Sequence, residues 1–340
     1  MQNTNKSMNL QDIDIVEDDI WQLYPEAFRQ LLRDHTTQKN IYWATRDYEY
    51  LGENYTFHAE IKPELITGEN GNIIRPRVLK GQAIQSSRSK DMAEVFTPSW
   101  VCNAQNNLVD EVWFGRKDVF NIENQAMHTW KATTDSIKFP KGKSWVNYVS
   151  EKRLEFTCGE APYLVSRYDT TTGKFIPLQE RIGMLDRKMR VISENVNDSR
   201  TWLKKAQLAY MSIYGYEWQG DNLLLARESL LISFIEYYKA KFGKLPMERS
   251  IRYMAYIISW NIWQMDGLKG VLPDSCHDVT ISGTSSFDLA AEGLPCEGCC
   301  RGDIHKHNGI YCLIRNWGVR DRKTGERNRK VRFVDLMKQS

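Results

Sequence analysis

The amino-acid sequence predicts an α/β fold built on a parallel β-sheet. Residues 154–164 run from an apolar stretch into a Gly-containing turn, and residues 213–217 and 261–266 are apolar stretches that each end in an acid. The apolar positions of residues 221–241 repeat with helical periodicity, and a second helix is expected over residues 246–258. Strands that alternate with helices in this way are typical of β-α-β units in a parallel sheet.

The length and composition are those of an ordinary globular protein. The 340 residues are enough for one large α/β domain with appendages, or for two domains with separate cores. Hydrophobic residues make up 41% and charged residues 26%, and the net charge of +3 is too small to indicate nucleic-acid binding by itself. No run of about 18 apolar residues is present, and residues 1–19 contain no apolar signal segment. We therefore expect a cytoplasmic protein without a membrane span.

The residue pattern divides the chain into three parts. Residues 1–90 mix a helical pattern with an alternating stretch, residues 55–61, that predicts a strand, and with a turn, residues 67–72, that predicts a hairpin. Residues 91–270 carry the alternation of strands and helices. Residues 271–340 are rich in Gly, Cys, His and charged residues, which indicates an element organised by something other than an apolar core. We expect an N-terminal α+β extension, a ligand-binding α/β domain and a small Cys-rich C-terminal element.

The ends of the three predicted strands carry residue types that suit a nucleotide-like ligand. A strand that leads into a Gly-containing turn brings backbone N–H groups close to a ligand. Glu217, at the end of the second strand, has a carboxylate that can accept hydrogen bonds from two ribose hydroxyls. Asp266, at the end of the third strand, can accept a hydrogen bond from an adenine amino group.

Together with the upstream segment Glu-Val-Phe-Thr-Pro at residues 94–98, these motifs resemble the S-adenosylmethionine-dependent DNA adenine-N6 methyltransferases of restriction-modification systems. The chain looks most like those called restriction endonuclease subunit M, and the resemblance covers most of residues 80–270. It implies a Rossmann-like methyltransferase domain, S-adenosylmethionine as cofactor and double-stranded DNA as partner, with a restriction or specificity subunit as a further possible partner. The residues that the resemblance assigns to the cofactor are Phe96, Thr97, Pro98, Glu155, Cys158, Gly159, Tyr163, Glu217 and Asp266.

Two residues of the first motif depart from the family pattern. Ala161 stands where the family usually has a second glycine, so the turn has to accommodate a methyl group. Glu160 adds a negative charge that would lie near the cofactor carboxylate unless its side chain points away. Thr97 and Pro98 also form an ordinary helix start, with Thr as the cap and Pro at the first position.

The catalytic motif of the family has no clear counterpart. Adenine-N6 methyltransferases carry Asn or Asp, two prolines and an aromatic residue, which orient the target amino group and stack on a base flipped out of the duplex. The chain contains no Pro-Pro, and its best positional counterparts are Gly293, Leu294, Pro295 and Cys296. We expect an adenine methyltransferase or modification subunit whose acceptor lies elsewhere, or else a non-catalytic cofactor- and DNA-binding subunit that requires a partner. The candidate acceptors are Asp274, Asp278 and Glu292.

Cysteines and histidines gather between residues 276 and 312. A Cys-x-x-Cys pair, Cys296 and Cys299, lies between Cys276 and Cys312, and this spacing can fold two loops onto a tetrahedral Zn²⁺. These four cysteines are the predicted ligands, with Cys300 or a histidine as a substitute. A catalytic zinc of the base-deaminase kind would need a His-x-Glu motif, which the chain lacks, so a structural zinc is favoured.

Two basic segments, residues 138–143 and 320–330, are candidates for contact with DNA phosphates. The second is expected to form a hairpin. A nuclease is the alternative, because Asp47 followed by Glu60-Ile61-Lys62 has the order of acids and lysine found in metal-dependent nucleases. That pattern is common by chance, so the methyltransferase-like interpretation is preferred.

Overall fold

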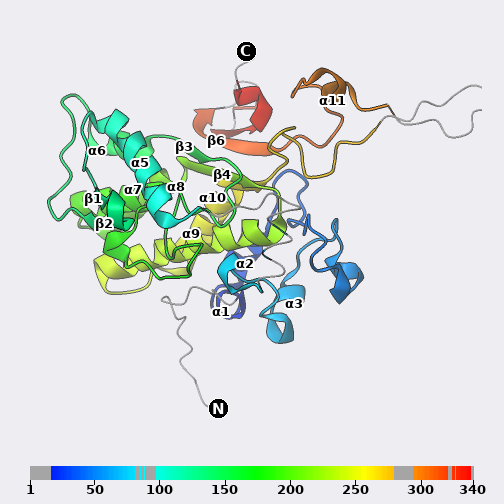
Figure 1. Ribbon diagram of the computed structural model, residues 1–340, viewed down its shortest axis with the longest axis horizontal. Coiled ribbons are helices and arrows are strands. Elements are labelled where there is room, and N and C mark those ends of the chain that lie inside the picture. Colours follow the sequence, from blue (N-terminus) through cyan, green and yellow to red (C-terminus); the bar gives the residue numbers. More distant parts are fainter. Residues whose placement is uncertain are drawn as a thin grey trace, which may run out of the picture.

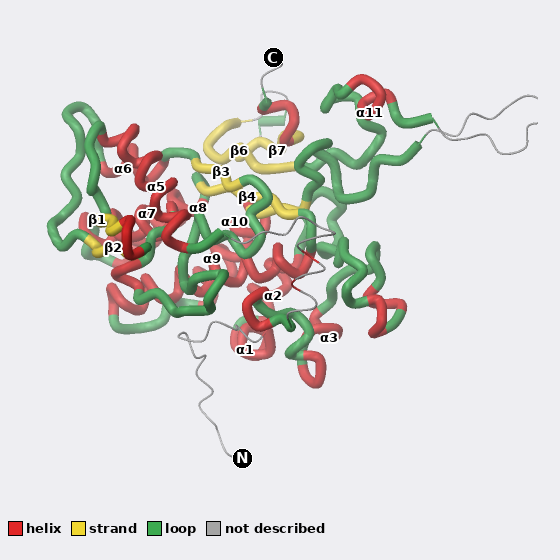
Figure 2. The backbone as a smooth tube through the Cα atoms, viewed as in Figure 1, coloured by secondary structure: helices red, strands yellow, loops and turns green. Residues whose placement is uncertain are grey.

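The computed structural model describes residues 17–81, 85, 88, 97–278, 294–320, 324–325 and 327–337. These residues form a mixed α/β structure with helices and three small β-sheets (Figures 1 and 2). The α/β class expected from the sequence is therefore confirmed in its general form. None of the helices in the described ranges is both long enough and apolar enough to cross a membrane.

The central sheet has three parallel strands: β3 (Arg153–Glu155), β4 (Ile213–Glu217) and β5 (Ile262–Gln264). Their order is β3-β4-β5, so β4 pairs with both neighbours. Every residue of β4 and β5 is buried, as expected for parallel strands covered on both faces. All three predicted strands are present, but three parallel strands do not by themselves establish a Rossmann-like fold, which remains a prediction.

Helices connect the strands and cover one face of this sheet. Between β3 and β4 lie α7 (Met184–Asn195) and α8 (Ser199–Tyr210). Between β4 and β5 lie α9 (Gly220–Phe242) and α10 (Glu248–Asn261), which confirm the two helices predicted after Glu217. The first sixteen residues of α9 are all buried, because other elements enclose this helix (Figure 1).

A two-stranded antiparallel hairpin covers the opposite face of the sheet. It consists of β6 (Leu313–Arg320) and β7 (Arg327–Arg332), and it confirms the hairpin predicted for the basic C-terminal segment. Ile314 and Phe333 pack in one apolar cluster with Tyr214, Tyr216 and Trp263 of the central strands. The hairpin thus buries the aromatic face of the sheet, opposite α9 (Figure 1).

The N-terminal segment shares the main core. It contains α1 (Glu17–Leu23), α2 (Pro25–Leu32) and a short α3 (Pro63–Ile66), and apolar side chains of α2 pack with those of α9 and α10. The strand predicted at residues 55–61 is wrong, because this stretch makes only an isolated bridge between Tyr42 and Glu60. The predicted hairpin at residues 67–72 is also wrong. Its apolar neighbours Ile61 and Ile66 are buried in the helical core, so no partner strand is needed to cover them.

Two helices and a β-hairpin precede β3. They are α5 (Ser99–Phe114), the hairpin of β1 (Asn121–Asn124) and β2 (Thr129–Ala132), and α6 (Trp145–Ser150). A short helix, α11 (Glu297–Arg301), lies in the Cys-rich element. Short 3-10 helices occur at Glu49–Leu51, Glu53–Tyr55, Gly68–Asn70, Arg77–Leu79, Gln125–Met127, Leu178–Glu180 and Phe333–Leu336. The division of the chain near residues 90 and 270 stays a prediction.

Candidate functional site

A cavity of about 1100 Å³ lies at the carboxyl ends of β3, β4 and β5. In open α/β sheets this edge is where ligands bind, because the loops that leave the strands converge there. The cavity brings together seven of the nine residues that the sequence assigned to a cofactor. They are Thr97, Glu155, Cys158, Gly159, Tyr163, Glu217 and Asp266.

The turn after β3 is held by hydrogen bonds within the backbone and by the carboxylate of Glu155. The Cys158 N–H donates to the Tyr216 carbonyl at 2.8 Å, which ties the turn to β4. Both Glu155 oxygens accept backbone N–H groups, from Tyr163 at 3.3 Å and from Leu164 at 3.2 Å. Burial raises the pKa of Glu155 well above its usual value, although these two hydrogen bonds oppose the shift.

Glu217 ends β4 and faces the same turn. Its Oε2 accepts the Gly159 N–H at 2.8 Å, and its Oε1 accepts the Gln219 N–H at 3.2 Å. The residue is only 8% exposed, so its position is fixed by the protein around it. Each carboxylate oxygen has two lone pairs. Glu217 can therefore hold the turn and still accept hydrogen bonds from a ligand hydroxyl pair.

Asp266 follows β5 and organises its own turn. Its Oδ1 accepts the N–H groups of Leu268 at 2.9 Å and Lys269 at 3.2 Å, and the Lys269 ammonium lies 3.9 Å from Oδ2. The residue is 6% exposed and lines the cavity. Gly267 packs so closely on Tyr216 that a Cβ atom there would lie 2.5 Å from the ring. A side chain at position 267 would therefore collide with the Tyr216 ring. Because Oδ1 of Asp266 is used by the turn, Oδ2 is the oxygen available to a ligand amino group.

The upstream motif is only partly placed at the cavity. Phe96 lies outside the described residues, Thr97 lines the cavity, and Pro98 occupies the cap position of α5 without lining it. The expected Thr97 cap is wrong, because Asp169 instead accepts the Ser99 N–H at 2.7 Å. Burial acts to raise the pKa of Asp169, but hydrogen bonds from Thr171 and Ser99 outweigh it and lower the pKa to about 2. Asp169 is distant in sequence, so local pattern could not identify it as the cap.

The two departures in the first motif are accommodated by the fold. Glu160 does not line the cavity, since its Oε1 accepts the Arg77 N–H at 2.7 Å and its Oε2 accepts the Tyr168 hydroxyl at 2.6 Å. Its charge therefore points away from the proposed ligand. Ala161 adopts a φ of 60° in the left-handed region and is fully buried. The turn thus tolerates the methyl group at some conformational cost.

Sequence reasoning missed several polar side chains of the cavity wall. Asn106, on α5, donates to the carbonyls of Tyr163 and Ile182, both at 3.1 Å, and so holds the turn that follows β3. Gln105 and Asn222 also line the cavity. No sequence pattern singles out Gln105 and Asn106, because α5 reaches the site only through the tertiary fold, whereas Asn222 lies in the first turn of α9.

The three described counterparts of the catalytic motif do not line this cavity. Gly293 lies outside the described residues, and Leu294, Pro295 and Cys296 belong to the Cys-rich element around α11. Among the alternative acceptors, Asp274 is exposed and lies 3.3 Å from His58, Asp278 is exposed, and Glu292 is outside the described residues.

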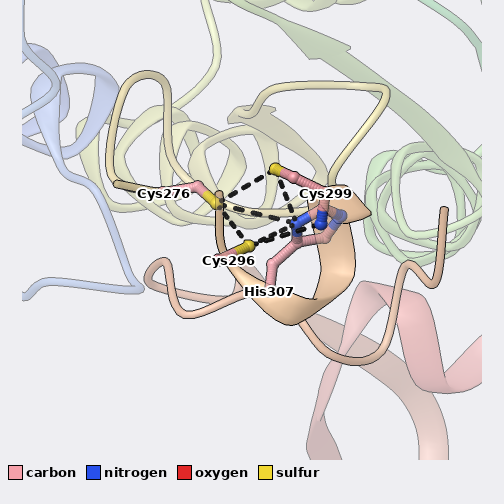
Figure 3. A group of neighbouring side chains, drawn as sticks. All are labelled: Cys276, Cys296, Cys299 and His307. Carbon is pink, nitrogen blue, oxygen red and sulfur yellow. Dashed lines mark hydrogen bonds between the residues drawn. The ribbon is translucent and has the colours of Figure 1, made fainter. Parts of the chain in front are cut away.

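Four metal-ligating side chains converge in the Cys-rich element: Cys276, Cys296, Cys299 and His307 (Figure 3). Their ligand atoms lie within 4.8 Å of one another. Cys276 Sγ is 3.2 Å from Cys296 Sγ and 3.7 Å from Cys299 Sγ, and the three sulfurs lie 3.4–3.6 Å from His307 Nδ1. The edges of a tetrahedron around Zn²⁺ are about 3.8 Å between two sulfurs and about 3.5 Å between sulfur and nitrogen. The group therefore has the donors and the spacing of a Cys₃His zinc site.

His307, and not the predicted Cys312, is the fourth member of this group. Cys312 is buried against the central sheet, where its Sγ donates to the Gln264 carbonyl at 3.3 Å. Cys300 also lies outside the group and contacts the Pro295 carbonyl. A histidine was expected only as a substitute ligand, because spacing alone cannot show which residue turns toward the cysteines.

Gly298 explains how His307 reaches the cysteines. This residue separates Cys296 from Cys299 within the Cys-x-x-Cys pair, and a Cβ atom there would lie 2.7 Å from His307 Nδ1. Cys296 caps α11 by accepting the Cys299 N–H at 3.4 Å. The short helix thus presents both sulfurs on the side where the imidazole ring packs.

The residues of the alternative nuclease pattern have other contacts. Asp47 accepts a 2.6 Å hydrogen bond from Arg88 Nε, and Glu60 accepts the Asn40 N–H at 3.0 Å.

On the basic β6–β7 hairpin, Arg320 and Arg327 are exposed and lie opposite each other on the two paired strands.

No protein-family model, no curated protein and no solved structure matches the chain.

Proposed function

We propose that the chain binds S-adenosylmethionine and acts as a DNA adenine-N6 methyltransferase or modification subunit of a restriction-modification or phage-defence system. One observation carries the proposal. Gly159, Glu217 and Asp266 come from three separate strand ends, and all three line the same cavity in the order that the family motifs require.

The proposed roles follow from the hydrogen-bonding chemistry of these residues. Glu217 accepts hydrogen bonds from the two ribose hydroxyls, and Asp266 Oδ2 accepts one from the adenine amino group. The turn around Gly159 gives the methionine moiety access to the backbone. The cofactor supplies an electrophilic methyl group on its sulfonium, and the protein orients it toward the target amine.

The alternative is a non-catalytic, cofactor- and DNA-binding subunit that requires a partner. The sheet favours this alternative in one respect, because β3 is an edge strand and no described residue forms a further strand on its outer side. In the family the catalytic motif follows a strand that comes after the adenine-binding acid, and here Leu294–Cys296 lie at the Cys-rich element instead. A partner could then supply the acceptor for the target amine.

The Cys₃His group could hold zinc, and we propose a structural Zn²⁺ there. Four protein ligands close a tetrahedral site and leave no position for a catalytic water. A deaminase-like role is therefore disfavoured.

The basic β6–β7 hairpin is the proposed contact for DNA phosphates. A cytoplasmic location stays a prediction.

Transfer of a labelled methyl group from S-adenosylmethionine to unmethylated double-stranded DNA tests the proposal. Asp266→Asn keeps the acceptor that organises the turn but replaces the ligand-facing oxygen with a donor, so it should abolish transfer. Asp135→Asn, at an exposed acid outside the cavity, should leave transfer intact. If the wild-type chain binds cofactor and transfers nothing, the non-catalytic alternative is supported. If it binds neither cofactor nor DNA, both versions are wrong.

A further inference from the structure

We propose that the Cys276, Cys296, Cys299 and His307 group binds Zn²⁺ in order to hold the Asp266 turn in place, so that the metal centre controls the geometry of the cavity. The expected effect on cofactor affinity rests on the proposed function. The effect on the turn itself does not.

The first step is the chain of backbone contacts between the metal ligands and Asp266. Val271 bridges Asp266 on one side and Tyr311 on the other. The Asp266 N–H donates to the Val271 carbonyl at 2.8 Å, and the Leu272 N–H donates to the Ile310 carbonyl at 2.9 Å. The segment that carries Asp266 is thus held by the segment that follows His307.

The second step is that both of these segments lead directly to metal ligands. Cys276 lies four residues after Leu272, and His307 lies three residues before Ile310. Between them, Ser275 Oγ accepts the Ile310 N–H at 3.0 Å, and Asn308 exchanges hydrogen bonds with the backbone of His277. An ion bound to Cys276 and His307 therefore clamps the open end of this short ladder.

The third step is that the segment of residues 294–311 has no apolar core of its own. Among residues 294–311, only Cys296 and Gly298 are buried. A segment without an apolar core is organised by a metal when it supplies four ligands, and the energy of metal binding then becomes folding energy. Without the ion, we expect the His307 segment to detach and the Asp266–Val271 bridge to open.

The experiment measures metal content and amide hydrogen exchange on the purified full chain. Wild type should contain one Zn²⁺ per chain. His307→Ala should lose the metal and show exchange at least about tenfold faster at Asp266 and Leu272, while peptides from α9 remain unchanged. His307→Cys should keep the metal and the slow exchange, which separates loss of the ligand from loss of the histidine.

His305→Ala is the matched control, because His305 lies two residues away but outside the ligand group. It should behave like wild type in both measurements. Metal loss without faster exchange at Asp266 would overturn the proposed clamp, and a wild-type chain that takes up no Zn²⁺ would overturn the metal centre. The affinity for S-adenosylhomocysteine should be lower in the His307→Ala variant, which lacks the metal, than in wild type. If wild type binds no such ligand, the proposed function fails, but the exchange result still decides whether the metal holds the turn.

Discussion

The backbone N–H of Gly159 donates a 2.8 Å hydrogen bond to Oε2 of Glu217. This bond joins the turn after β3 to the end of β4, two sites that lie 58 residues apart in the chain. Since Cys158 also bonds to the carbonyl of Tyr216, the turn is fixed to the neighbouring strand at two consecutive residues. The cavity wall is therefore built before any ligand arrives, which lowers the cost of binding.

The same turn stores conformational strain at Thr157. This exposed, β-branched residue adopts a φ of 44°, a region that disfavours such side chains. Thr157→Gly should raise the free energy of unfolding by about 1 kcal/mol, since little packing is lost. Thr56→Gly is the control, because Thr56 is also exposed but has an ordinary φ of −72°. Glycine there should lower the free energy of unfolding, since it relieves no strain and makes the unfolded chain more flexible. Urea unfolding of the three proteins measures the difference, and equal losses in both variants would contradict the argument.

Gly298 should be required for metal binding. A methyl group at this position would meet the imidazole of His307, so Gly298→Ala should displace the ring and weaken zinc affinity by about tenfold or more. Gly302→Ala, at the end of the same short helix, meets no atom within 4 Å and should retain zinc, although the φ of 64° at this position costs alanine about 1 kcal/mol of stability. Competition with a chromophoric chelator measures both affinities. Equal zinc affinity in the two variants would show that His307 is not a ligand.

His35 should make stability depend on pH. Its ring stacks on Trp260 at 3.9 Å between centroids, and burial, together with the charges of Arg227, Arg315, Arg33 and Lys330, lowers its pKa from 6.5 to about 2. Below pH 6.5 the unfolded chain takes up a proton that the folded chain refuses, so stability falls as the pH falls, by at most about 1.4 kcal/mol per pH unit.

His35→Gln tests this dependence, because glutamine does not titrate. Unfolding free energies at pH 7, about 6 and about 5.5 should decline more steeply for wild type than for the variant. Parallel curves would mean that folding does not lower the pKa of His35.

Cations of the β6–β7 hairpin should set the salt dependence of DNA binding. Arg320 and Arg327 are exposed and lie opposite each other on the two paired strands. The double variant Arg320→Gln with Arg327→Gln should reduce the slope of the logarithm of the DNA association constant against the logarithm of the salt concentration by about 1.8, because two phosphate contacts are lost. Neutralising Lys117 and Lys244, which are exposed elsewhere, should leave the slope unchanged. The same reduction in both double variants would indicate a general charge effect and not a hairpin contact.

The strands and helices around the cavity could be predicted because their signals are local. The apolar run before Glu217 and the helical periodicity after it specify β4 and α9 without any knowledge of the rest of the chain. The motif residues then converge because parallel strands bring their carboxyl ends to one edge. Here the pattern and the fold agree.

The errors arose where tertiary contacts decide. Cys312 and His307 are equally plausible ligands by spacing, but Cys312 is buried against β5 and only His307 turns toward the cysteines. Likewise, the alternating pattern of residues 55–61 predicted a strand, yet the apolar side chain of Ile61 is buried in the helical core. Local periodicity cannot predict either outcome, because each depends on which distant element covers the side chain.

Binding of S-adenosylhomocysteine, measured by titration calorimetry, tests the central claim most directly. Wild type should bind one equivalent, and Glu217→Gln should bind about tenfold or more weakly, because one carboxylate oxygen becomes an amide nitrogen, which can accept a hydrogen bond neither from a ribose hydroxyl nor from the turn N–H group that it faces. Glu248→Gln, an exposed acid on α10, should bind like wild type. Absence of binding by the wild-type chain, or equal affinity in all three proteins, would contradict a cofactor site at the ends of β3, β4 and β5.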